Sequence, residues 1–349
     1  MKYSIKIALT LFFFLSFASL AQAINGDGSK ESPFQIKSLA DFLKFRDTVN
    51  HGFCNADAVL LTDIDLSSVC YKDTVNETEV QWLPIGDWTA AYRGNFNGDG
   101  HVVRNIYVNS DVECFRGVFG LTRNAHIRNL GVETIYIHGG YYTGGLIGQA
   151  DSCTITNCYT QGYVYGYFTA GMIGECSNSK VTNCYSVCTS EGNYHGALLG
   201  YINNENCTIS HCYYDPAFTS VGDGRNYGVV TAKSTESFKN GAVVELLNEY
   251  VTSYGGDSLL FWHQDEGENA LPRLGATSEV KNIPNEEDGL TPYLIGDELY
   301  LHASNKGIVT LIDINGKLVC RKHYEKGENH IGTLPKGCYI LNGKKIVIQ

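Results

Sequence analysis

The chain has 349 residues, with 26 Lys and Arg against 37 Asp and Glu, and a formal net charge of −11. Nucleic-acid-binding domains need clustered Lys and Arg, and anionic lipid attracts basic chains, so this charge argues against both partners. Sugars and other proteins remain as partner classes.

Residues 1–23 have the pattern of a signal peptide. Lys2 and Lys6 give a positive start, residues 7–20 carry no charge, and a small-x-small cleavage site ends at Ala23. The uncharged stretch is shorter than the roughly 20 residues that a membrane-spanning helix needs. The sequence therefore predicts export and removal of residues 1–23. No later segment is long and apolar enough to predict a transmembrane segment in the mature chain.

A short helix is predicted next, from a Ser-x-x-Asp start at Ser38 to a stop at Asn50 and Gly52. Such a helix can cover the apolar end that an array of repeats exposes. Two brief strands follow. Asp63 lies between them and Asp65 lies within the second, and we interpret both as turn and capping groups.

One pattern, Gly-x-x-Gly, recurs through residues 102–215, and its closing glycines are 28, 26 and 26 residues apart. The second and third copies are followed by Asn-Cys-Tyr, and the blurred fourth copy by His-Cys-Tyr. The repeat-defining residues are Gly117, Gly120, Gly145, Gly148, Gly171, Gly174, Gly200, Cys158, Cys184 and Cys212. A fixed period in the twenties indicates stacked supersecondary units.

Each repeat holds about three brief apolar or β-branched stretches separated by Gly, Asn or Ser, which is typical of a parallel β-helix. We therefore predict an all-β chain whose residues 24–275 form a right-handed parallel β-helix, or solenoid, with terminal caps. Asn side chains should stack from turn to turn, and the cysteines should form a column of packed thiols about 4.8 Å apart. Cys320 and Cys338 are the better candidates for a disulfide.

The repeat pattern ends near Pro216. A short helical piece at 237–248, with apolar segments at 261–264 and 271–275, predicts a second terminal cap. Residues 276–290 are a polar, acidic linker. Residues 291–349 contain two Asn-Gly dipeptides, Asn315-Gly316 and Asn342-Gly343, between alternating strands, which predicts hairpins and a small antiparallel β-sandwich.

The repeats resemble those of the GLUG-motif proteins, which are exported by Bacteroidetes of the gut and mouth. The resemblance covers residues 25–275 and rests on Gly-Leu-Ile-Gly with Asn-Cys-Tyr, on Trp-x-Pro-Ile-Gly at 82–86 and on the turn at 96–101. The chain departs from the family pattern at Asn97 and at Ala197 in the fourth copy.

Residues 291–349 resemble the C-terminal sorting domain of type IX secretion substrates. The matching segments are 313–319 and 334–340, with Cys338 at a position where the family has Val or Ile more often. The resemblance implies that outer-membrane secretion machinery binds residues 291–349, and that the protein passes through the periplasm to the cell surface or the medium. The alternative is that residues 291–349 form a carbohydrate-binding sandwich. The position of this segment, after a linker at the C-terminal end, favours the sorting role.

Catalytic motifs are lacking in the sequence: there is no His-Glu-x-x-His, no Gly-x-Ser-x-Gly and no Walker loop. No Cys-x-x-Cys zinc pattern occurs either. The residues after the four Gly-x-x-Gly copies are Leu121, Gln149, Glu175 and Tyr201, so no column of carboxylates forms there. We interpret Glu175 as a solvated group at a coil edge, and we predict no catalytic residue, cofactor or metal.

Tyrosines crowd the coils, mostly before a Gly-x-x-Gly. The candidate ligand-binding residues are Tyr141, Tyr142, Tyr163, Tyr165, Tyr167 and Tyr194. Exposed rings on a rigid ladder can stack on sugars or anchor a protein. The alternative is that they are ordinary stacking columns of the solenoid.

The sequence thus predicts a non-catalytic, adhesin-like exported protein that binds a glycan or a host protein. A polysaccharide lyase or glycoside hydrolase on the same scaffold is one alternative, and a structural surface spacer is another. Two carboxylates, or a carboxylate with Arg or His, converging in a groove would favour the enzyme.

Overall fold

The computed structural model describes residues 24–203, 206–225, 227–255, 258–265, 267, 270–275, 290–295, 298–313, 318–334, 337–341 and 344–348. The predicted signal peptide, 1–23, and nearly all of the predicted linker lie outside the described residues. The described part is mostly β-strand with few helices.

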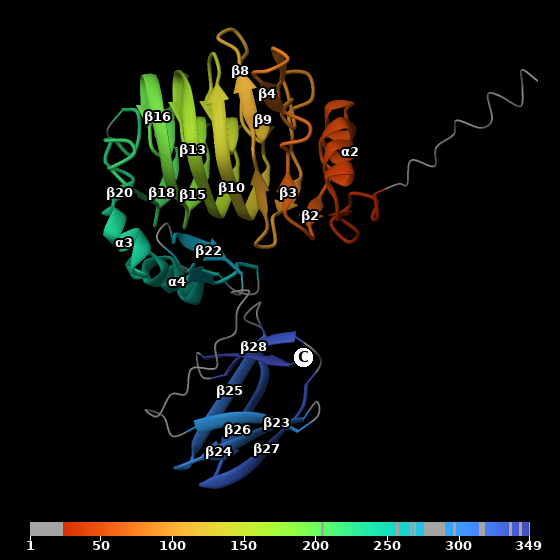
Figure 1. The fold of residues 1–349 in the computed structure, drawn as a ribbon, viewed down its shortest axis with the longest axis vertical. Helices are drawn as coiled ribbons and strands as arrows, with labels where there is room; N and C mark the ends of the chain where they lie inside the picture. The colour runs from red at the N-terminus through yellow and green to blue at the C-terminus, as the bar shows by residue number, and fades with distance from the viewer. Residues whose placement is uncertain are drawn as a thin grey trace, which may run out of the picture.

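The N-terminal part consists of β1 (Phe34–Ile36), α2 (Leu39–Asn50), β2 (Ala58–Leu60), β3 (Ile64–Asp65), β4 (Tyr71–Asp73) and β5 (Thr78–Val80). Helix α2 begins where the sequence predicts, because the Ser38 hydroxyl accepts a hydrogen bond of 3.1 Å from the Asp41 amide. Its buried face presents Phe42, Phe45 and Val49 to the core. The helix covers the N-terminal end of the strand array (Figure 1).

The repeats form a parallel β-solenoid of about seven turns. Its largest sheet follows the order β1-β2-β6-β10-β13-β16-β19-β20, with each strand parallel to the next. A second sheet has the order β17-β14-β12-β9. The bounds are β6 (Asn95–Asn97), β7 (Val102–Arg104), β8 (Tyr107–Asn109), β9 (Phe119–Arg123), β10 (His126–His138), β11 (Thr143–Gly144), β12 (Ile147–Asp151), β13 (Thr154–Ala170), β14 (Ile173–Ser177), β15 (Lys180–Thr182), β16 (Tyr185–Gly196), β17 (Leu199–Ile202), β18 (Thr208–Ser210), β19 (Tyr213–Tyr214) and β20 (Thr231–Ala232).

The Gly-x-x-Gly copies align turn above turn, as predicted. Ile147 pairs with Phe119 and Ile173, and Ile173 pairs with Leu199. A Cβ built on Gly145 would lie 2.3 Å from the carbonyl oxygen of Gly171 in the next turn. Glycine is therefore required here for close backbone approach between turns.

The predicted asparagine ladder is present inside the repeats. The Asn157 side-chain amide donates to Asn129 Oδ1 at 2.7 Å, and the Asn183 amide donates to Asn157 Oδ1 at 2.7 Å. All three residues have positive φ, between 53° and 60°, a conformation that Asn tolerates better than most residues. The ladder therefore pairs buried amides from turn to turn, although Oδ1 of Asn183, its last member, has no partner among the described residues.

The cysteines whose side chains are described are thiols. Cys158, Cys184 and Cys212 are buried in the solenoid core, and burial raises the pKa of the Cys184 thiol. Cys320 is also a thiol, so the predicted Cys320–Cys338 disulfide is absent from the structure.

The segment predicted as a second terminal cap covers a side of the solenoid as well as its last turn. It contains α3 (Thr235–Lys239), α4 (Ala242–Tyr254), β21 (Trp262–Gln264) and β22 (Pro272–Leu274). The predicted single helix is two helices, because Gly241 adopts a left-handed conformation at φ 89° between them. Figure 1 shows α4 and β22 beside the strands of the repeats.

The side of the solenoid that this segment covers carries a column of outward-pointing tyrosines, and the segment buries their apolar surface. Tyr159 and Tyr185 stack at 5.2 Å, and both contact the ring of Trp262. Together with Leu247 and Val251 of α4 they form a second buried cluster. We call residues 234–275 the side cover.

The C-terminal part consists of antiparallel strands: β23 (Leu290–Ile295), β24 (Glu298–Ala303), β25 (Gly307–Asp313), β26 (Leu318–Tyr324), β27 (Gly327–Thr333), β28 (Gly337–Leu341) and β29 (Lys344–Ile348). They form the sheets β23-β24-β27 and β26-β25-β28-β29. The predicted pairings β25–β26 and β28–β29 are confirmed. The Asn-Gly turns themselves lie outside the described residues. Residues of both sheets, such as Leu301 and Leu311, share one buried cluster.

Candidate functional site

A column of five aromatic rings runs along one corner of the solenoid, and we call it the aromatic ridge. Its members are Trp88, Phe115, Tyr142, Phe168 and Tyr194. Successive ring centroids lie 6.0, 5.3, 5.5 and 5.1 Å apart, with interplanar angles of 26°, 16°, 16° and 28°. The last four rings each lie two or three residues before a Gly-x-x-Gly copy.

Trp88 and Phe115 are not among the tyrosines predicted from the sequence, although both lie at the repeat spacing of 26 to 27 residues. The ridge residues are 27, 27, 26 and 26 positions apart, so extending the repeat toward the N-terminus finds both. Trp88 is 72% exposed and Tyr194 is 40% exposed, whereas the rings between them are half-buried. Because neighbours cover the faces of the inner rings, those rings present mainly edges to a ligand.

The six predicted tyrosines do not form one platform. Tyr141 and Tyr167 contact each other at 4.7 Å and flank the ridge members Tyr142 and Tyr194. Tyr141 is 49% exposed. These four residues are brought together.

Tyr163 and Tyr165 lie apart from the ridge, on the middle of β13. Tyr163 belongs to a second column in which Tyr107, Tyr136 and Tyr163 stack at 5.4 and 5.6 Å. Its hydroxyl donates to Glu191 at 3.1 Å. Tyr165 packs edge-on against His138 at 4.4 Å.

Beside the ridge, the second sheet carries a polar pocket of about 210 Å³. We call it the carboxylate pocket, and its lining residues are Arg123, Gln149, Asp151, Ser177, Asn178 and Asn203. Tyr201 links the two features, because it pairs with Glu175 in the sheet and contacts Phe168 of the ridge at 4.7 Å. The guanidinium of Arg225 stacks on Tyr201 at 4.5 Å.

Glu175 is buried, with 3% of its surface exposed, so its interpretation as a solvated group is wrong. Its Oε2 accepts a hydrogen bond of 2.9 Å from Gln149, and its Oε1 accepts a longer one, 3.4 Å, from Ser177. Burial raises the pKa of Glu175, and these donors oppose the shift. The sequence could not show this burial, because it depends on the packing of neighbouring turns beside the ridge.

Glu175 and Asp151 occupy adjacent strands of this sheet, since Gln149 pairs with Glu175 and Asp151 pairs with Ser177. A carboxyl with a raised pKa near a second carboxylate is the arrangement that glycoside hydrolysis uses. Here the Glu175 oxygens are enclosed and bonded to neighbours, whereas a catalytic acid must reach the leaving oxygen of its substrate. Asp151 lines the pocket, but Glu175 is buried beside it and is not one of the lining residues.

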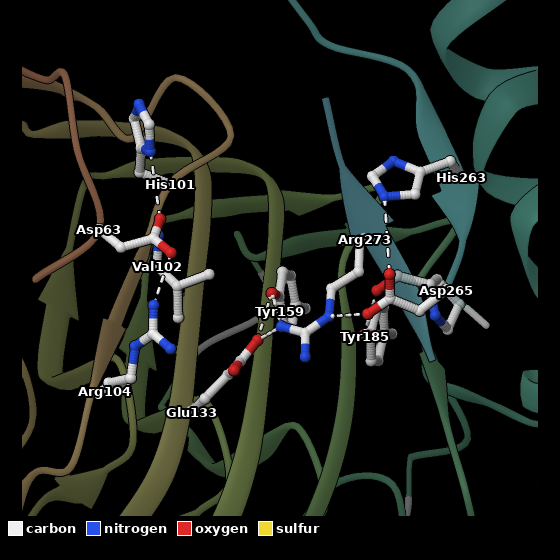
Figure 2. Close-up of polar contacts among 11 residues, drawn as sticks. Asp63, His101, Val102, Arg104, Glu133, Tyr159, Tyr185, His263, Asp265 and Arg273 are labelled. Atoms are coloured by element: carbon white, nitrogen blue, oxygen red, sulfur yellow. Dashed lines mark hydrogen bonds and ion pairs between the residues drawn. The ribbon is translucent and has the colours of Figure 1, made fainter. Parts of the chain in front are cut away.

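A second polar cluster joins the side cover to the repeats (Figure 2). Arg273 of β22 forms ion pairs with Glu133 and with Asp265, the latter at 3.0 Å, and donates to the Tyr159 hydroxyl at 2.6 Å. Burial lowers the pKa of Arg273. The cluster therefore bonds a strand of the cover to β10 and β13.

Asp63 lies in the same view, at the N-terminal side of this cluster (Figure 2). It accepts hydrogen bonds from His101 at 3.1 Å, Arg104 at 2.5 Å and the Val102 amide at 3.1 Å. The His101 bond, followed by the Val102 amide and the charge of Arg104, lowers the pKa of Asp63. Asp65 accepts from the Ser67 amide at 2.9 Å, which is the expected turn role, whereas Asp63 bonds residues of the neighbouring turn and is not a local turn group.

Among the residues that the structure describes, no group of three or more His, Cys, Asp or Glu side chains is placed to hold a metal ion. The described helices are also too short or too polar to cross a bilayer.

Two curated proteins match parts of the chain. One is the "Putative Gly-rich membrane protein" of Evansella cellulosilytica, 31% identical over 113 residues, which are 32% of this chain and 12% of that protein. The other is halomucin of Haloquadratum walsbyi, 29% identical over 154 residues, which are 42% of this chain and 2% of that protein. The chain thus spans a small fraction of either relative. No family model matches the chain. No solved structure matches it.

Proposed function

We propose that the protein is a non-catalytic, adhesin-like binding protein, exported to the cell surface or the medium, whose ligand contacts the aromatic ridge. The observation that carries the proposal is the ridge itself, with an exposed Trp88 at one end and the exposed Tyr141 at its side. Trp and Tyr are the residues that most often anchor a binding interface. The rings of Trp88 and Tyr141 contact neighbouring rings, Phe115 and Tyr167, which limits the side-chain entropy lost on binding.

The geometry of the ridge favours a protein ligand over a sugar at this place. Sugars stack on ring faces, and the faces of Phe115, Tyr142 and Phe168 are occupied by neighbouring rings. The exposed edges and the Tyr hydroxyls suit the mixed apolar and polar contacts of a protein interface. A glycan remains the alternative ligand, and it would stack on the exposed ring face of Trp88.

The export route in this proposal rests on the residues 1–23 pattern and on the two resemblances. Residues 25–275 would be a right-handed GLUG-type solenoid, and residues 291–349 a sorting β-sandwich recognised by type IX secretion machinery in the outer membrane. The names of the two relatives, a Gly-rich membrane protein and halomucin, support a surface location.

A polysaccharide-degrading enzyme is the second candidate, because Glu175 has a raised pKa and lies one strand from Asp151. The enclosure of Glu175 argues against it. A structural spacer is the third, and it would need no exposed aromatic surface.

Binding to arrays of glycans and of surface proteins tests the proposal, with Trp88→Ala and Tyr141→Ala as variants. Tyr71→Ala is the matched control, because Tyr71 is a 39% exposed tyrosine on β4, outside the ridge. We expect the ridge variants to weaken binding about tenfold or more and the control to leave it unchanged. Equal binding by all variants would reject the ridge. Release of reducing ends that Glu175→Gln abolishes would establish the enzyme instead.

A further inference from the structure

A second pocket, of about 290 Å³, lies between the largest sheet and helix α4. Its lining includes Asn95 of β6, His126 and Arg128 of β10, Thr154 of β13, and Tyr250 and Tyr254 of α4. The aromatic ridge and the carboxylate pocket contribute none of these residues. We call it the cover pocket.

The sheet register places basic side chains together on the outer surface at this pocket. Ile127 is buried, so His126 and Arg128 on either side of it point outward from β10. Thr154 pairs with His126 on one side and with Lys180 on the other. The exposed Lys180 is therefore two strands from His126, at a backbone distance of about 10 Å. Positions 95, 97, 126, 128, 154, 156, 180 and 182 carry no acidic residue.

Arg128 has no acceptor among the described residues, although its Nε is enclosed. This distinguishes it from the neighbouring arginines, since Arg104 pairs with Asp63 and Arg273 pairs with Glu133. Arg128 lines the pocket, and the other two nitrogens of its guanidinium can donate to water or to a ligand there. The His126 ring likewise has no hydrogen-bond partner within the described part of the chain.

Two carboxylates on the neighbouring strand and turn, Asp57 and Asp99, accept hydrogen bonds from Asn95 and Asn97. Asp57 is buried and accepts from the Asn95 backbone at 2.7 Å and from its side chain at 2.8 Å. Asp99 accepts from the Asn97 side chain at 3.4 Å. In the part of the chain that the structure describes, neither carboxylate forms an ion pair with Arg128 or His126, so in a chain of net charge −11 these basic side chains are available to an anion.

The opposite wall of the pocket is aromatic. Tyr250 and Tyr254 lie one helical turn apart on α4, with ring centroids at 5.1 Å, and Tyr254 is 70% exposed. A ring of this kind packs against the apolar face of a sugar. Thr154 and Asn95 add polar groups that can bond hydroxyls.

We propose that the cover pocket binds an anionic saccharide, with a uronic-acid carboxylate on the Arg128 guanidinium and the sugar ring against Tyr254. The planar fork of Arg matches a carboxylate with two parallel hydrogen bonds, which a lysine cannot reproduce. This site goes beyond the proposed function, because it uses a different face and different residues from the ridge. Either can fail while the other stands.

Calorimetric titration of the chain with three oligosaccharides of equal length tests the proposal: a polyuronate, a sulfated glycan and a neutral glycan. We expect the polyuronate to bind, and Arg128→Gln to weaken it at least about tenfold, the loss expected for one charged hydrogen-bonding partner. Arg128→Lys should recover only part of the affinity, and Tyr254→Ala should weaken it as well. Added salt should weaken binding to the wild type.

Arg321→Gln is the matched control, because it removes the same charge from an exposed position on β26. Trp88→Ala, a ridge variant, should also leave polyuronate binding unchanged. Unchanged thermal unfolding of Arg128→Gln would show that a loss of binding is local. Equal polyuronate binding by the wild type and Arg128→Gln overturns the proposal. Binding of the neutral glycan as tightly as the polyuronate, or of the sulfated glycan alone, also overturns it.

Discussion

The indole Nε1 of Trp262 donates a hydrogen bond of 2.6 Å to the side-chain oxygen of Asn157, although the two residues are 105 positions apart. Asn157 is at the same time the middle member of the asparagine ladder. One buried amide therefore connects three turns of the solenoid and the side cover.

We expect Asn157→Ala to lower the free energy of unfolding by about 3 kcal/mol, because Trp262, Asn183 and the Leu260 carbonyl each lose a buried partner. Asn157→Gly is the control, since it removes the same amide but accepts the φ of 60° without strain. The alanine variant should be the less stable by about 1 kcal/mol. Urea unfolding measures both, and a loss under 1 kcal/mol for either variant would contradict the role of the ladder.

Arg273→Met should release the side cover from the solenoid, with a smaller effect on the stability of the repeats. Glu133 keeps only 12% side-chain exposure and would lose its cation, so we expect a cost of about 2 kcal/mol. Asp265→Asn is the control, because Asp265 is 47% exposed and its ion pair with Arg273 is worth under about 1 kcal/mol. Limited proteolysis between 234 and 275 reads out detachment. Equal protection of both variants would show that the cover does not depend on this arginine.

Cys207 should react faster than the buried thiols of the folded repeats. Its hydrogen bond with Cys176 lowers its pKa to about 7, whereas burial raises the pKa of Cys188 to about 11. Alkylation by iodoacetamide, followed by peptide mapping, should modify Cys207 before Cys188, with a rate that rises through pH 7 as thiolate forms. Cys176→Ala should move this rise to higher pH. An unchanged profile in that variant would exclude Cys176 as the cause.

Glu175 should make the fold less stable as the pH rises. Its pKa is raised above the ordinary 4.5, so the folded state holds the proton more tightly than the unfolded state does. The stability it contributes is therefore present below pH 4.5 and is lost as the pH passes through the raised value. Glu175→Gln should remove this loss and be the more stable variant at pH 8. Glu31→Gln, at an exposed position, is the control, and parallel pH profiles for all three proteins would refute the shift.

The sequence by itself determined the repeat. The solenoid turns and the first helix could be predicted from the Gly-x-x-Gly copies, the Asn-Cys-Tyr positions and the helix start at Ser38. Each of these signals depends on local backbone geometry or on a neighbour one repeat away. The same period also contains Trp88 and Phe115, so the whole aromatic ridge was within reach of the sequence.

The tertiary structure alone decided how residues 234–275 fold back along the solenoid. That path brings Leu260 to Asn157 and Pro272 to Tyr185, 103 and 87 positions apart, and no period relates such pairs. It also creates the cover pocket, by placing Tyr250 and Tyr254 opposite Arg128. The tertiary structure also decided the burial of Glu175 and the separation of Tyr163 from the ridge, because both depend on which corner or face of a turn a residue occupies. A repeat sequence specifies the spacing of its turns, but the contacts made across them depend on the route of the whole chain.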